Sequence, residues 1–270
     1  MANQSAEARK NEISIGLGFG KGEKSINNYS GLFEYTRSLT KKLSVTGKVN
    51  YTAISGELAN TNGPGDLFLS ITNSFDVKRK WQKSFTAGLK IPFNSANKMM
   101  NNISLPMPYQ TSLGTTDLLL AINYSRKSAG ITLAFQQPLN STNKNKFLTS
   151  DYPLGHPAIE YLSTNEFSRK ADLVGKIFFG FKPGKRIFIR PGLLGIYHTA
   201  NDTYLNESKF RTTITNSRGL TLNGFFLVDY RLTNESGFEL SLGTPFLVRK
   251  QRPDGLTRKF AAVLEYKFSF

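Results

Sequence analysis

Apolar and polar residues alternate one by one through the segment 12–19 of this chain. The alternation sets four apolar residues against four polar or small ones: Ile13, Ile15, Leu17 and Phe19 against Glu12, Ser14, Gly16 and Gly18. Because successive side chains of a β-strand point to opposite faces, a period of two predicts a strand with one apolar and one polar face.

The same alternation returns about eleven more times along the chain. We expect strands at 12–19, 29–38, 43–51, 66–75, 84–91, 116–126, 129–138, 170–182, 186–199, 218–232, 237–247 and 258–270. Gly, Phe and Tyr recur evenly, with no composition shift that would divide the chain into two domains. The sequence therefore predicts one all-β domain over residues 1–270, in which residues 1–10 form a flexible N-terminal extension.

The connections between these strands are alternately short and long. Short ones fall near 38–42, 77–81, 125–128, 182–186 and 233–236, and the long ones at 93–114, 139–169 and 199–217 are rich in Asn, Ser, Thr, Gly and Pro. Bacterial outer-membrane barrels have short periplasmic turns, long extracellular loops and an even number of strands. We therefore predict a closed antiparallel transmembrane β-barrel of about twelve strands, with both termini in the periplasm.

A membrane barrel and a soluble barrel differ in whether their apolar faces point outward or inward. The longest apolar run we find, FFLV at 225–228, is far too short for a spanning helix, which needs about 20 apolar residues. Apolar faces turned outward would meet lipid, and the polar faces would form a hydrated lumen. A large soluble two-sheet sandwich is the alternative. Charges on the polar faces are expected to set the selectivity of the lumen: Glu34, Lys48, Asp66, Lys90, Asp117, Asp172, Lys176, Arg190, Asp229, Glu239 and Glu265.

The chain carries a formal net charge of +16, from 35 basic and 19 acidic residues. Its basic residues are not gathered into a stripe or arm, so nucleic acid is not expected as a partner. Many sit in the short turns, and others, such as Lys144, Lys146, Arg169 and Lys170, lie in or beside one long loop. We expect most of them to be solvated; the alternative is contact with lipid headgroups or lipopolysaccharide phosphates. The chain has no cysteine, and no cofactor or metal site is expected.

The chain ends in the segment FAAVLEYKFSF, which places aromatic residues on one face up to the last position. This segment resembles the C-terminal signal by which the barrel-assembly machinery recognises outer-membrane proteins. The resemblance implies that Tyr266, Phe268 and Phe270 act as an assembly signal, that the assembly machinery is a partner, and that the protein resides in the outer membrane of a Gram-negative bacterium.

Three internal segments carry a second resemblance: GPGDLFLSITNSF at 63–75, FTAGLKIPFNS at 85–95 and SLGTTDLLLAINYSR at 112–126. They are similar to the outer-membrane transporter family labelled meta-pathway of phenol degradation. The resemblance implies a small-molecule channel or uptake barrel. We interpret GPGD as a tight loop re-entering the barrel, with Asp66 turned into the lumen, and Asp117 as the same device on another strand. Alternatively, both carboxylates accept hydrogen bonds at loop ends.

Only two histidines could serve a catalytic mechanism, His156 in a long loop and His198 at a strand end. Barrel lipases use a His-x-Ser pair, and this chain reads His198, Thr199, Ala200. The nucleophile is missing from that pattern, although Thr199 or Thr203 could formally replace it. We expect no enzyme, and a structural role for His198 at the loop rim.

These observations predict a channel for passive passage of a small solute across the outer membrane. The alternative is a non-conducting barrel that serves as an anchor or joins an envelope protein partner, and a lipid hydrolase is the third reading.

Overall fold

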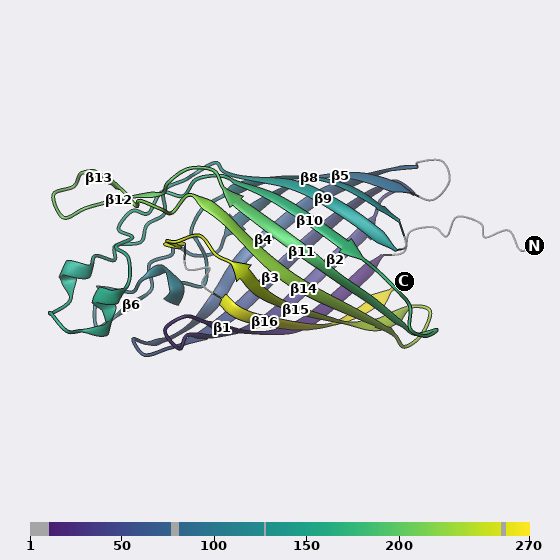
Figure 1. Ribbon diagram of the computed structural model, residues 1–270, viewed down its shortest axis with the longest axis horizontal. Helices are drawn as coiled ribbons and strands as arrows, with labels where there is room; N and C mark the ends of the chain where they lie inside the picture. The colour runs from purple at the N-terminus through teal and green to yellow at the C-terminus, as the bar shows by residue number, and fades with distance from the viewer. Residues whose placement is uncertain (1–10, 77–80, 127, 255–257) are drawn as a thin grey trace, which may run out of the picture.

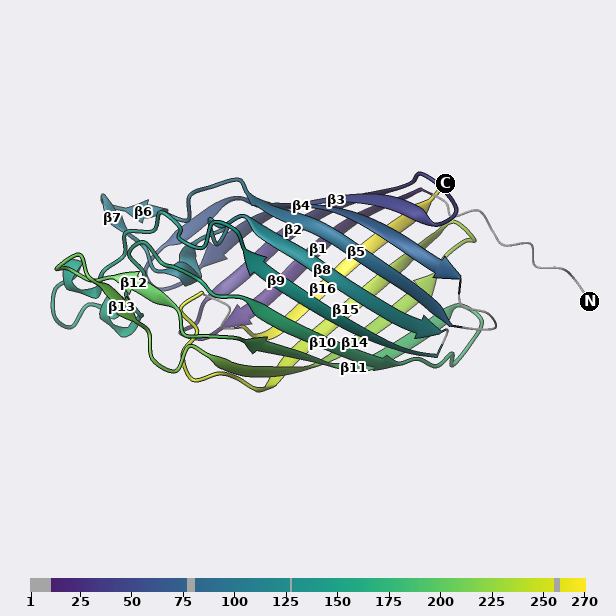
Figure 2. The ribbon, with the colours of Figure 1, turned by 90° about the horizontal axis from the view of Figure 1, so that it is seen from above.

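The computed structural model describes residues 11–76, 81–126, 128–254 and 258–270, and the predicted flexible segment 1–10 lies outside these ranges. Its main sheet is a closed antiparallel barrel of twelve strands, drawn in Figures 1 and 2. The barrel strands are β1 (Glu12–Gly22), β2 (Asn27–Ser38), β3 (Leu43–Ser55), β4 (Asn60–Asp76), β5 (Gln82–Pro92), β8 (Asp117–Arg126), β9 (Ala129–Pro138), β10 (Asp172–Phe179), β11 (Ile187–His198), β14 (Gly219–Arg231), β15 (Ser236–Leu247) and β16 (Arg258–Ser269). The predicted fold class is confirmed.

The first and last strands close the barrel. β1 pairs antiparallel with β16 on one side and with β2 on the other. Beyond the strand ends, Asn11 N donates to Phe270 O at 2.8 Å, and Phe270 N donates to Asn11 O at 2.9 Å. The closed ladder leaves no open sheet edge, so the strands can satisfy their backbone hydrogen bonds without water.

Side chains alternate between an apolar outer face and a polar inner face. On β1, Leu17 is 74% exposed on the outside, whereas Ser14 is 4% exposed and donates to Glu265 Oε2 at 2.9 Å. On β10, the side chains of Leu173 and Ile177 are exposed on the outside, whereas the side chain of Asp172 is buried inside the barrel. The apolar faces therefore surround the barrel, as expected for a wall in contact with lipid.

The two ends of the barrel differ in structure. Short turns lie at the end that holds the C-terminus, and the long loops gather at the opposite end (Figure 1). Those loops carry two small hairpins and three short helical turns: β6 (Met99–Met100) with β7 (Ile103–Ser104), β12 (Thr203–Leu205) with β13 (Arg211–Thr213), η1 (Met107–Tyr109), η2 (Thr149–Asp151) and η3 (Pro157–Glu160). Their apolar core includes Ile26, Ile54, Leu105 and Tyr109.

In the part of the chain that the structure describes, no helix is long and apolar enough to cross a membrane.

A charge placed on the outer face of β1 should destabilise the barrel in lipid. We expect Leu17→Arg to lower the free energy of unfolding by about 2–4 kcal/mol, because the side chain lies halfway along its strand. The measurement is guanidinium unfolding in phospholipid vesicles. The control is Leu154→Arg, in a loop where the leucine is 98% exposed, and it should have no effect. Equal losses for the two variants would contradict an outward, lipid-facing Leu17.

Candidate functional site

The three segments that carry the family resemblance meet on one wall of the lumen, near the loop end. The motif GPGD is not a loop, as its sequence suggested, but part of β4, opposite a register irregularity in β3. There Asn50 Oδ1 accepts from Asp66 N at 3.2 Å. A Cβ on Gly65 would lie 2.4 Å from Asn50 Nδ2, so the glycine lets Asn50 cross to the neighbouring strand.

The motifs at 85–95 and 112–126 supply a buried ion pair. Lys90 Nζ lies 2.8 Å from Asp117 Oδ2 and 3.3 Å from Thr115 Oγ1. Gln136 from β9 also donates to Asp117. The Asp117 carboxylate therefore forms an ion pair, which goes beyond the loop-end hydrogen bond that its sequence position also allowed.

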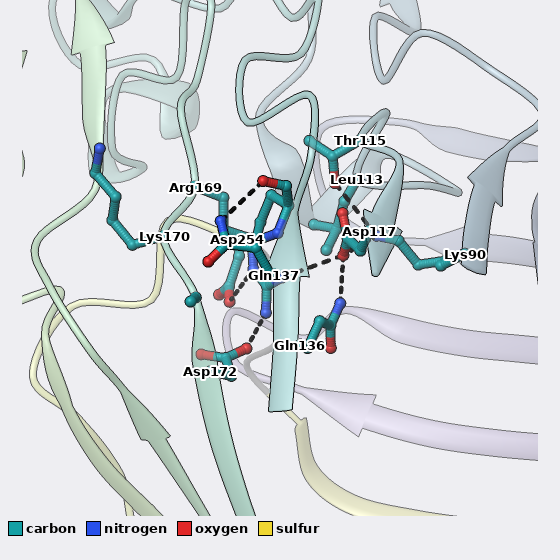
Figure 3. Close-up of polar contacts among 12 residues, drawn as sticks. Lys90, Leu113, Thr115, Asp117, Gln136, Gln137, Arg169, Lys170, Asp172 and Asp254 are labelled. Carbon is teal, nitrogen blue, oxygen red and sulfur yellow. Dashed lines mark hydrogen bonds and ion pairs between the residues drawn. The ribbon is translucent and has the colours of Figure 1, made fainter. Parts of the chain in front are cut away.

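Arg169 joins this pair to the opposite side of the lumen. Its guanidinium contacts Asp172, lies 3.5 Å from Asp117 Oδ2 and 3.9 Å from Asp254 Oδ2, and Figure 3 shows it between these groups. Only 3% of Arg169 is exposed, so the expectation that it is solvated in its loop was wrong. Burial alone would lower the pKa of Arg169, but Asp172, Asp254 and Asp117 outweigh it and raise that pKa above its ordinary value.

His198 extends the cluster along the wall. Its Nδ1 lies 2.6 Å from Asp172 Oδ1, and its Nε2 lies 2.8 Å from Asp202 Oδ1. Both ring nitrogens of His198 are therefore held by carboxylate side chains. Thr199 Oγ1 donates to Ala171 O, so it is not bonded to the imidazole. His198 is buried beneath the rim, and its structural role stays a prediction.

The loop between β15 and β16 provides the far side of the cluster. Arg249 Nη2 lies 2.5 Å from Asp254 Oδ2, and Arg249 Nη1 donates to Ser217 O at 3.1 Å. Burial would raise the pKa of Asp254, but Arg249 and Arg169 lower it below its ordinary value. The cluster thus sets three cations and one histidine against four carboxylates: Lys90, Arg169, Arg249 and His198 against Asp117, Asp172, Asp202 and Asp254.

The contact between Arg169 and Asp254 separates two cavities, since both residues line both of them. One cavity, which we call the apolar chamber, has a volume of about 400 Å³ and includes Val174, Leu194, Ile196, Phe225 and Pro245 in its wall. The other, the polar chamber, has a volume of about 370 Å³ and includes Lys48, Asn50, Asp66, Phe68 and Ser112. β10 and β15, whose loops supply the two residues, are separated in the sheet by β11 and β14.

A second charged group lies toward the short turns, and we call it the Arg190 ladder. Arg190 Nη2 lies 2.8 Å from Asp229 Oδ1 and 2.7 Å from Glu239 Oε2. Lys267 Nζ continues the ladder, at 3.2 Å from Glu239 Oε1 and 4.0 Å from Glu265 Oε2. The ladder borders a cavity of about 550 Å³ that extends to the turn residues.

The remaining expected lumen charges lie between these groups. Lys48 Nζ is 3.4 Å from Glu34 Oε2 across β2 and β3. Lys176 Nζ lies 4.6 Å from the ring centroid of Phe225. Three of the expected lumen charges meet in the cluster around Arg169, namely Lys90, Asp117 and Asp172. Four belong to the Arg190 ladder, namely Arg190, Asp229, Glu239 and Glu265. The other four belong to neither group, namely Asp66, Glu34, Lys48 and Lys176.

The structure adds Arg169, Asp202, Arg249 and Asp254 to the cluster, and no pattern in the sequence pointed to the last three. They sit in loops without periodicity, so nothing in the sequence singles out their ion pairs, although Asp202 lies only four residues from His198 and Asp254 only five from Arg249. Arg169 had one usable signal, because it precedes Asp172 by three residues at the start of a strand.

The residues of the expected assembly signal lie on the outer face of the last strand. Tyr266, Phe268 and Phe270 are each more than one-third exposed. The Tyr266 ring lies 5.4 Å from that of Phe238, and the Phe268 ring lies 5.9 Å from that of Phe270. They form an aromatic edge at the turn end, and their role as a signal stays a prediction.

Solved structures resemble the whole barrel. An outer membrane channel from Pseudomonas putida F1 aligns over 100% of both chains, with a TM-score of 0.69 and 14% sequence identity. The NanC porin aligns over 96% of this chain and 100% of its own, with a TM-score of 0.56 and 8% identity. The chain has the fold of an outer-membrane β-barrel. No protein-family model and no curated protein sequence matches it.

Loss of the central guanidinium should destabilise the loop end. We expect Arg169→Met to lower the free energy of unfolding by about 3–5 kcal/mol, because it removes one buried cation from a cluster that keeps all of its buried carboxylates. The control is Arg211→Met, whose partner Glu166 lies 3.9 Å away on the exposed loop surface, with an expected loss of about 0–1 kcal/mol. Both are measured by guanidinium unfolding in detergent micelles, and similar losses would show that the buried cluster is not held by Arg169.

Proposed function

We propose that the barrel is a channel through which a small solute passes passively across the outer membrane. The observation that carries the proposal is the succession of cavities inside one closed barrel, from the two chambers near the loops to the cavity beside the Arg190 ladder. Their volumes, about 370 to 550 Å³, are in the range of small-molecule sites. The fold it shares with an outer membrane channel supports the same proposal.

Selectivity in this proposal comes from paired charges along the wall. Arg190 faces two carboxylates, Asp229 and Glu239, and Lys176 lies on the neighbouring wall. Charges of both signs across a narrow lumen create a transverse field with little net preference for simple cations or anions. We therefore infer a small conductance with weak ion selectivity.

The experiment is conductance of the refolded barrel in planar bilayers. Neutralising both cations, with Lys176→Gln and Arg190→Gln, should shift the reversal potential in a salt gradient toward cations, because the wall loses two positive charges and Asp229 loses its ion-pair partner. The control pair Leu173→Ala and Ile177→Ala changes outward side chains on the adjacent strand and should leave the reversal potential unchanged. A shift in the control pair alone would overturn the assignment of these charges to the conducting path.

A non-conducting barrel is the second candidate, and the crowded loop end favours it. Loops from β5–β8, β9–β10 and β15–β16 all contribute side chains to the region around Arg169. If those loops close the lumen, the protein would be an anchor or part of an envelope complex. Purified barrels that insert into bilayers without any measurable current would support this candidate over the channel.

We infer that the barrel is not a lipid hydrolase, because both nitrogens of His198 are held by carboxylates and none of its hydrogen bonds within the described residues joins a hydroxyl. The assembly machinery and lipopolysaccharide remain proposed partners. Aromatic residues at the strand end support the first, and basic residues in loops and turns support the second.

A further inference from the structure

Asp66 differs from the other charged residues of the polar chamber. Its Oδ1 accepts a hydrogen bond from Ser112 Oγ at 2.5 Å, and among the described residues no cationic group lies within ion-pair distance of either carboxylate oxygen. Ser112, from one of the resembling motifs, thus holds the side chain of Asp66, and Asn50 on β3 holds its backbone. The result is a positioned carboxylate without a counter-charge.

Every other charged group that lines the same chamber has a partner. Lys48 pairs with Glu34, and Lys90 pairs with Asp117. Arg169 lies among Asp117, Asp172 and Asp254, and Asp254 is also paired with Arg249. Among the described residues that line the chamber, Asp66 is therefore the one charged group without an ion-pair partner.

The geometry of the chamber suits a small solute with a positively charged end. Phe68, Leu32, Met107 and Pro108 also line it, so a carbon skeleton could pack against apolar surface while its charged end meets Asp66. An ammonium group donates in three directions and forms a charge-assisted hydrogen bond with a carboxylate. A carboxylate solute would be repelled by Asp66, and to reach Arg169 it would have to compete with three aspartates.

We infer that Asp66 binds the ammonium group of a small amine-bearing solute in the polar chamber. The inference rests on the proposed channel function, since the chamber would be a stage of the passage. The same chemistry could come from a simple organic cation or from a zwitterion, and the two are separated by the choice of probes.

Binding is tested by calorimetry on the detergent-folded barrel, with four probes of one carbon-chain length: butylammonium, γ-aminobutyrate, 1-butanol and butyrate. Butylammonium should bind and butyrate should not. If γ-aminobutyrate binds as tightly as butylammonium, the site accepts zwitterions; if it binds at least tenfold more weakly, the site is restricted to cations. 1-Butanol should bind at least tenfold more weakly than butylammonium, since it has no charge for Asp66.

The variants isolate the charge from the shape of the site. Asp66→Asn keeps an oxygen for Ser112 and removes the charge, and it should weaken butylammonium binding at least tenfold. Asp66→Glu keeps the charge and should retain binding within a few-fold. Asp151→Asn, at an exposed loop residue, should change nothing. A β-type circular dichroism spectrum identifies the folded variants.

The inference is overturned if butylammonium fails to bind the native barrel, if Asp66→Asn binds it as tightly as the native barrel, or if butyrate binds more tightly than butylammonium. These readouts are independent of conduction. Current through the native barrel without amine binding would refute only the site, and amine binding to a barrel that carries no current would refute only the channel.

Discussion

The pairing of backbone hydrogen bonds around a closed ring is the constraint on which the rest of this structure depends. Lipid offers no partner for an unpaired N–H or C=O, so every strand that crosses it needs a neighbour on both sides. β1 meets that requirement only by pairing with β16, almost the whole chain away. Closure in turn fixes the inside and outside of every strand, because each residue steps to the opposite face. The outer apolar belt and the inner polar wall are then two halves of one pattern.

Charges on an inner wall lie close together, and each partly buried one needs a partner of opposite sign. The lumen supplies such partners in two ways. Near the turns, Arg190 and Lys267 pair with carboxylates on neighbouring strands, so the sheet register alone brings the partners together. Near the loops, the wall carries Asp117 and Asp172, and the loops deliver Arg169 to them. The loop end is thus tied to the barrel by charge, in addition to the apolar contacts around Tyr109.

The strands could be predicted from the sequence because each one shows its own alternation of apolar and polar residues. Contact of the outer face with lipid keeps that alternation regular. β4 is the instructive exception: it starts at Asn60, and the polar and proline residues before Asp66 looked like a turn. That stretch lies at the loop end, where lipid does not select for apolar residues. The Lys90–Asp117 pair was foreseeable as two inward charges, whereas the only signal for Arg169 was its spacing from Asp172. Its position depends on Asp117, 52 residues away, and on the fold of loops whose sequences have no period.

Paired and unpaired charges in the lumen differ in how strongly they can favour one solute over another. A balanced pair orients dipoles and holds water, but a solute gains little by replacing one partner, since the other is then left alone. An uncompensated carboxylate such as Asp66 gives a passing cation an interaction that costs the protein no existing ion pair. Its backbone is held through Asn50 and its side chain through Ser112, so it need not reorganise to bind. Discrimination among solutes is therefore expected at Asp66, the carboxylate of the polar chamber that has no ion-pair partner among the described residues, and the paired charges hold the lumen around it.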